Sequence, residues 1–131
     1  MSEPWPVIHT YTRREAISDG VLVELDEHAA ARIPWHTAIT AAAYADAIEW
    51  DETNPLPQDE SGRAWDVLVC AAAAVRSRAV PDRREQRIPM SVWRVPNTAH
   101  SVAPRPLRLV AHLGPGDDGE PVLTVMLPEE D

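Results

Sequence analysis

The sequence predicts a single α+β domain over residues 1–131, with an antiparallel sheet of about four strands and two main helices packed on one face. Three observations lead to this fold class. Two runs rich in Val and Leu flank a polar loop near the C-terminus, which is typical of a β-hairpin. Apolar residues recur at helical spacing over residues 61–79. A chain of 131 residues is also long enough to bury one hydrophobic core.

The first well-defined element is a short helix over residues 13–18. Thr12 and Glu15 have the spacing of a capping box, in which each side chain accepts a hydrogen bond from the backbone N–H of the other residue. Gly20 suits the left-handed backbone conformation that follows many helix ends. The Val- and Leu-rich residues 21–25 then predict a strand.

The segments around this unit carry weaker signals. Residues 7–9 favour the start of an edge strand, and residues 26–32 favour either a helical turn or a loop. Pro34 ends any helix there, because the residue before a proline is pushed out of the α region. Residues 36–50 have a strongly helical composition and predict the first main helix. Its apolar stripe comprises Ile39, Ala43, Ala47 and Trp50.

Residues 61–79 predict the second main helix. Its core-facing positions alternate between spacings of three and four residues, as one face of a helix requires. Pro81 ends the helix because its ring cannot continue the helical hydrogen bonding. The residues assigned to the core are Trp65, Leu68, Ala72, Val75 and Ala79.

Two further segments complete the predicted sheet. Residues 87–95 are rich in β-forming side chains and predict a strand. Pro89 places this strand at an edge or a bulge, because proline donates no hydrogen bond to a neighbouring strand. Residues 106–128 predict the C-terminal hairpin, with its turn at residues 114–119.

The composition argues against several classes of function. A formal net charge of −9 disfavours a general nucleic-acid binder, since such proteins neutralise phosphates with Lys and Arg. The same charge suits a protein that offers carboxylates to a basic partner. The single Cys70 excludes an internal disulfide. The chain has neither a membrane-spanning apolar run nor a signal-peptide pattern, so we expect a cytoplasmic protein without a membrane partner.

The charges are unevenly distributed along the chain. Residues 76–108 contain eight Arg and two acids, whereas residues 44–60 and 114–131 each contain six acids and no base. Two interpretations remain open: compensation between surfaces of one molecule, or two separate binding surfaces. The candidate interaction surface lies in the basic segment. It comprises Arg84, Arg87, Trp93, Arg94, Arg105 and Arg108.

No group of residues predicts catalysis, and we expect no cofactor and no metal. The loop at residues 114–120 holds three carboxylates, but their spacing is not that of a calcium-binding loop, and a solvated turn explains the composition. The five His form no paired metal-ligand spacing. Cys70 lies in an Ala-rich helix and is typical of a small buried apolar residue. The sequence therefore favours a protein that is not an enzyme.

Two motifs carry a family resemblance. Residues 11–23 follow the pattern Tyr-Thr-Arg-x-x-Ala-Ile-x-Asp-Gly-Val-Leu-Val, and residues 114–121 read Gly-Pro-Gly-Asp-Asp-Gly-Glu-Pro. Arg94-Val95-Pro96 lies between them in the expected order. With these motifs the chain resembles an uncharacterised family of small proteins carried by bacterial plasmids, phages and other mobile elements. The resemblance implies no catalytic residues.

The resemblance and the charge layout together lead to one main expectation and two alternatives. We expect a mobile-element accessory protein that acts through contacts with a host protein, including a role against restriction or CRISPR defence. The first alternative is a binder of phosphate, nucleotides or another small molecule that uses Arg94 and the other central arginines. The second is nucleic-acid binding through the same arginines, which the net negative charge makes the weaker alternative.

Overall fold

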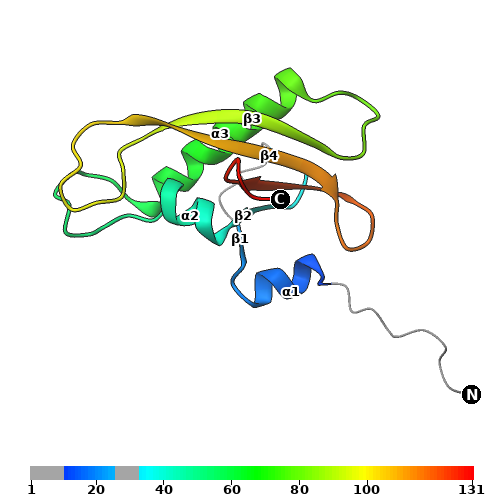
Figure 1. Ribbon diagram of the computed structural model, residues 1–131, viewed down its shortest axis with the longest axis horizontal. Coiled ribbons are helices and arrows are strands. Elements are labelled where there is room, and N and C mark those ends of the chain that lie inside the picture. The colour runs from blue at the N-terminus through cyan, green and yellow to red at the C-terminus, as the bar shows by residue number, and fades with distance from the viewer. Residues whose placement is uncertain (1–10, 26–32) are drawn as a thin grey trace, which may run out of the picture.

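The computed structural model describes residues 11–25 and 33–131, and it has an α+β architecture built on one five-stranded sheet (Figure 1). The strand order across the sheet is β1-β2-β5-β4-β3. The elements in chain order are α1 (Arg13–Ser18), β1 (Leu22–Glu24), β2 (Thr37–Thr40), α2 (Ala41–Ala47), α3 (Glu60–Arg78), β3 (Gln86–Arg94), β4 (Arg105–Pro115) and β5 (Pro121–Met126).

The sheet is mixed, so the prediction of about four antiparallel strands is only partly correct. The antiparallel pairs are β1–β2, β4–β5 and β3–β4, which include the predicted C-terminal hairpin. β2 pairs with β5 in parallel, and Ala38 lies opposite Thr124. This pairing joins strands that most of the chain separates, and no local pattern in the sequence encodes it.

The fifth strand comes from a segment that we predicted as part of a helix. Residues 36–50 form β2 followed by the seven-residue α2, instead of one continuous helix. Thr40 divides the two elements, because it has an extended backbone and its hydroxyl accepts from the Ala43 backbone N–H at 3.2 Å. Pairing of β2 with both β1 and β5 outweighs the helical composition of the segment.

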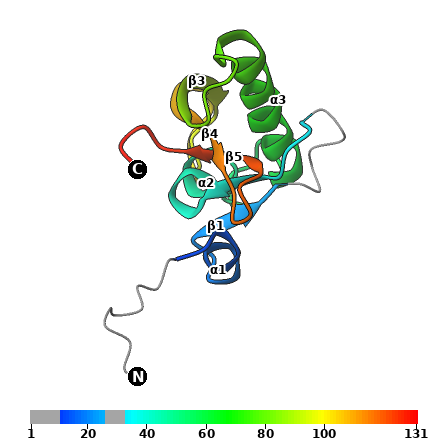
Figure 2. The ribbon, with the colours of Figure 1, turned by 90° about the vertical axis from the view of Figure 1, so that its right-hand side faces the viewer.

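The long helix α3 lies across one face of the sheet, as Figure 2 shows from the side. The prediction of two helices on this face is correct for α3, whereas α2 lies at the end of β2 and packs against the same core. Trp65 was assigned to the core but is 37% exposed on the outer side of α3. The α3 residues in the core include Ala64, Val67, Leu68, Ala71, Ala72 and Val75.

The strand β3 shows how the two faces of the sheet differ. Its residues alternate strictly between buried and exposed, and as the last strand in the sheet order it has the edge position that Pro89 predicted. We call the side under α3 the covered face and the other side the open face. The open-face residues of β3, β4 and β5 include Arg87, Pro89, Ser91, Trp93, Pro106, Arg108, Val110, His112, Thr124 and Met126.

The short helix α1 lies beside β1, at the opposite edge of the sheet from β3 (Figure 1). The predicted capping box between Thr12 and Glu15 is present, and Gly20 has the positive φ of 78° that was expected after the helix end. The predictions for residues 7–9 and 26–32 lie outside the described residues. Within residues 11–25 and 33–131, no helix is long and apolar enough to cross a membrane.

Candidate functional site

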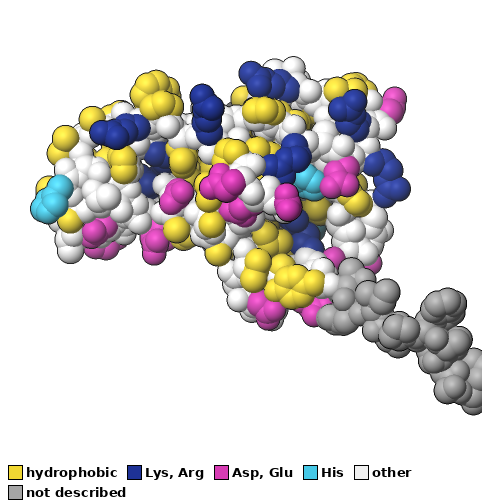
Figure 3. Space-filling view, viewed as in Figure 1, with side chains coloured by type: hydrophobic (Ala, Val, Ile, Leu, Met, Phe, Trp, Pro, Cys, Tyr) yellow, Lys and Arg dark blue, Asp and Glu magenta, His cyan; other side chains and the backbone are white. Residues whose placement is uncertain are grey.

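The open face carries an exposed aromatic and basic patch at the far ends of β3 and β4. Trp93 is 66% exposed and lies opposite Pro106, while Ser91 lies opposite Arg108. Trp93 and Arg108 are therefore diagonal neighbours on one surface, within reach of each other's side chains. We call Ser91, Trp93, Pro106 and Arg108 the Trp93 patch. Figure 3 shows this face, with arginine side chains gathered over β3 and β4.

Arg87 is on the same face but is held by the fold. Its guanidinium donates to the Met126 sulfur at 3.3 Å and to the Pro128 carbonyl at 3.0 Å. It therefore reaches across β4 and fastens the C-terminal segment to the sheet. His112, its partner in register, lies 2.9 Å from the Glu85 carboxylate. Arg87 contributes positive charge to the open face, and its position is fixed by these contacts.

Arg94 and Arg105 face the other side of the sheet. They lie directly opposite each other in the β3–β4 register, at the end beside α2. Arg94 is buried and pairs with Asp66 of α3 at 2.9 Å. Arg105 is exposed, and Arg84 is exposed in the turn before β3. The six residues of the candidate surface are thus divided among the open face, the covered face and a turn.

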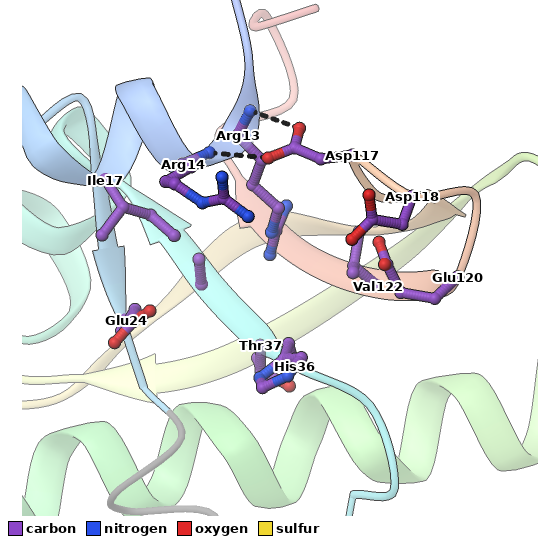
Figure 4. Close-up of a pocket in the computed structure, with 11 residues that line it drawn as sticks. Arg13, Arg14, Ile17, Glu24, His36, Thr37, Asp117, Asp118, Glu120 and Val122 are labelled. Carbon is purple, nitrogen blue, oxygen red and sulfur yellow. Dashed lines mark hydrogen bonds between the residues drawn. The ribbon is translucent and has the colours of Figure 1, made fainter.

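The two sequence motifs meet in space, which the sequence did not predict. The Asp117 carboxylate accepts from the backbone N–H groups of Arg13 and Arg14, at 2.7 and 3.0 Å (Figure 4). These backbone hydrogen bonds lower the pKa of Asp117. The loop between β4 and β5 is therefore no purely solvated turn. It closes the N-terminus of α1, so residues of the two motifs are in direct contact.

A cavity of about 250 Å³ lies under this junction, between α1, β2 and the loop. The Arg13 side chain crosses to β5, where it donates to the Thr124 hydroxyl at 2.6 Å and to the Leu123 carbonyl at 2.9 Å. Asp118 and Glu120 line the loop side of the cavity (Figure 4). The hydrogen bonds of Arg13 and Asp117 fasten α1 to the sheet, so the junction is a structural latch.

Sequence reasoning also missed Arg63, the largest fully buried side chain described. Its guanidinium lies 4.9 Å from the centre of the Trp50 ring and donates to the Ile48 and Val95 carbonyls at 2.9 and 3.1 Å. Burial and the nearby Arg94 charge lower the pKa of Arg63 to about 10. One signal was available: Arg63 lies on the same helical face as Val67, at a spacing of four residues.

The described residues offer little chemistry for catalysis. Cys70 is half-buried, and burial raises the pKa of its thiol, which disfavours the reactive thiolate. Across residues 11–25 and 33–131, no three His, Cys, Asp or Glu side chains are grouped as a metal site would need. The arrangement best suited to a function is the Trp93 patch, which can contact a surface that is both apolar and acidic.

Comparison with known proteins gives one family. Residues 2–131 match the family described as a family of unknown function (DUF6573), which covers almost the whole chain. No curated protein matches the chain, and no solved structure matches it.

Proposed function

The chain belongs to this family of unknown function, and from its geometry we propose a non-enzymatic interaction protein that binds an acidic surface of a partner protein. The observation that carries the proposal is Trp93, which is 66% exposed on a strand of the sheet. A large aromatic side chain normally costs free energy when it faces water. Burial in a partner would recover that free energy, and Trp and Arg are the residues that most often dominate binding energy.

Charge supports an acidic partner. Arg108 is exposed beside Trp93, and Arg87 lies further along the same face. Opposite charge at this contact would favour an acidic partner surface over a basic one. A second copy of the same patch would bring Arg108 side chains together, so self-association through this patch is disfavoured. The patch therefore fits a different protein better than a copy of this chain.

We further propose that the partner is a protein of the host cell. The resemblance to proteins of plasmids and phages supports a cytoplasmic host protein, and a component of a restriction or CRISPR system in particular. An effect of the protein on plating of phage or on plasmid transformation, lost in Trp93→Ala, would support this part. If expression leaves both measurements unchanged in hosts with either defence, the anti-defence role is wrong.

Capture of partners from host lysate tests the main proposal, with Trp65→Ala as the matched control. Trp65 is the other exposed Trp among the described residues and lies on α3, away from the open face. We expect a partner that the wild type and Trp65→Ala both retain and that Trp93→Ala loses. Arg108→Glu should weaken the same contact at low salt, because it reverses the charge that faces an acidic partner.

Two results would overturn the proposal of a protein partner at the Trp93 patch. A partner that Trp93→Ala retains at wild-type level would contradict the Trp93 patch as the binding surface. A gel shift with single-stranded nucleic acid that depends on salt and on Trp93 would replace the protein partner by a nucleic acid.

A further inference from the structure

A second cavity, of about 440 Å³, lies at the end of β3 and β4 where Arg94 and Arg105 pair, and it borders the Trp93 patch at Pro106. It lies between the ends of these strands, the connection that joins them and α2. This volume is in the range of small-molecule sites. Its lining residues include Asp46, Glu49, Arg94, Asn97, Thr98 and Arg105.

One wall of the cavity is basic. Arg94 and Arg105 lie directly opposite each other in the antiparallel register, and like charges at such positions repel. The buried Arg63 guanidinium is close enough to Arg94 that the two charges interact, and it donates hydrogen bonds to the neutral oxygens of Ile48, Gln58 and Val95. Asp66 is the carboxylate paired with Arg94, and its own side chain is 60% exposed. This wall therefore has more positive than negative charge.

The opposite wall is acidic. Asp46 and Glu49 reach the cavity from α2 and the residues after it, and both are exposed to solvent. A simple anion would be repelled by these carboxylates, and a simple cation would be repelled by the arginines. A molecule with separate negative and positive groups satisfies both walls.

Two buried polar atoms of lining residues also lack partners. Within the described part of the chain, Arg94 Nε donates no hydrogen bond and Asn97 Oδ1 accepts none. Arg94 is 5% exposed, so its unsatisfied N–H costs free energy in the unliganded protein. A carboxylate or phosphate group is the natural acceptor for a guanidinium N–H, and an ammonium group is a natural donor for Asn97.

From these walls we propose that the cavity binds a small zwitterion, with a carboxylate or phosphate on Arg94 and Arg105 and an amine on Asp46, Glu49 and Asn97. This site borders the Trp93 patch at Pro106, uses none of its other residues, and does not depend on the proposed protein partner. Arg105 is the adjustable part of the anion contact because it is exposed, whereas Arg94 is fixed by Asp66. The class includes free amino acids and aminoalkyl phosphates.

Titration followed by NMR tests the proposal on the full chain. The probes are glycine, γ-aminobutyrate and phosphoethanolamine, with acetate, inorganic phosphate and ethylammonium as the separate halves. At least one zwitterion should shift the Arg94 Nε–H resonance to a saturating value, with a dissociation constant at or below about 1 mM. Each separate half should bind at least about tenfold more weakly than that zwitterion. Binding by Trp93→Ala should match the wild type, which separates this site from the proposed function.

Variants on β4 give the matched control. Arg105→Gln should weaken the zwitterion about tenfold, since it removes one charge-assisted hydrogen bond. Arg108→Gln removes an arginine three residues away on the other face and should leave affinity unchanged. The double variant Asp46→Asn with Glu49→Gln should lose the preference for zwitterions over plain anions. Absence of saturation with every probe, equal binding of phosphate or acetate alone, or wild-type affinity in Arg105→Gln would overturn the proposal.

Discussion

The two faces of the sheet share the same strands but have opposite properties. On β4, Leu109 is 1% exposed beneath α3, while its neighbour Arg108 is exposed on the open face. On β3, Val92 is buried and Trp93 is 66% exposed. Alternation of side chains along a strand sends successive residues to different environments. The covered face supplies most of the apolar burial that stabilises the fold. The open face is buried at Val110 and Met126, and it presents charged and aromatic groups to solvent at Arg108 and Trp93.

The arginines show the same division by environment. Arg63 is enclosed by Trp50 and backbone carbonyls, and its charge is part of the core. Arg108 has the same side chain and stands in solvent. A count of eight Arg in residues 76–108 therefore overstates the basic surface, because Arg94 is buried and paired with Asp66.

The strongest test of this division is a pair of neighbouring substitutions on β4. Leu109→Ala should lower the free energy of unfolding by about 2–5 kcal/mol, because it leaves a cavity under α3. Arg108→Ala should change it by less than about 0.5 kcal/mol, as is usual for an exposed residue. Denaturant unfolding measures both. A similar loss for the two variants would show that the open face is also packed in solution.

The next largest loss of stability is expected when the buried Arg63 is replaced. Arg63→Leu keeps much of the apolar volume but leaves the Ile48 and Val95 carbonyls without their donor. We expect a loss of about 2 kcal/mol in the free energy of unfolding, from buried acceptors left unsatisfied. The exposed Arg76→Leu, on the same helix, serves as the control and should have little effect. Unchanged stability of Arg63→Leu would mean that these hydrogen bonds contribute nothing net.

A smaller, local effect is expected at the latch between the two motifs. Asp117→Ala removes the acceptor of the Arg13 and Arg14 backbone N–H groups. Their hydrogen exchange should become faster while exchange in α3 stays as in the wild type, since α3 does not depend on this contact. Asp118→Ala, at the next position of the loop, is the control. Equal exchange rates in Asp117→Ala and the wild type would contradict the latch.

The smallest effect is a pH dependence of the same contact. The folded pKa of Asp117 is below its ordinary value of 3.8, because the ionised carboxylate accepts two backbone hydrogen bonds. The contribution of the ionised Asp117 carboxylate to stability is therefore complete above pH 3.8, and it is lost as the pH falls through the lower pKa of the folded state. The protection factor of the Arg13 amide, which is its intrinsic exchange rate divided by its observed rate, should fall over that range in the wild type. In Asp117→Asn this acid transition should be absent; if it persists there, another group controls it.

Local sequence signals determined several elements of this protein. The Thr12–Glu15 capping box set the start of α1, the apolar spacing set α3, and Pro89 placed β3 at an edge. The Val- and Leu-rich runs set the C-terminal hairpin. Each signal acts through neighbouring backbone or side-chain positions, so it is legible in the chain alone. The basic segment likewise predicted where arginines gather along the chain, but not that Arg94 is buried or which face each arginine occupies.

Only the tertiary structure decided the remaining features, because each depends on residues far apart in the chain. Residues 37–40 became a strand when β1 and β5 supplied partners on both sides, which overrode their helical composition. Arg63 became a core residue because Trp50 and Val95 close around it. Asp117 became a helix cap through a contact spanning more than a hundred residues. Such long-range pairing leaves no periodic pattern in the sequence, and it also decides which arginines remain free to bind.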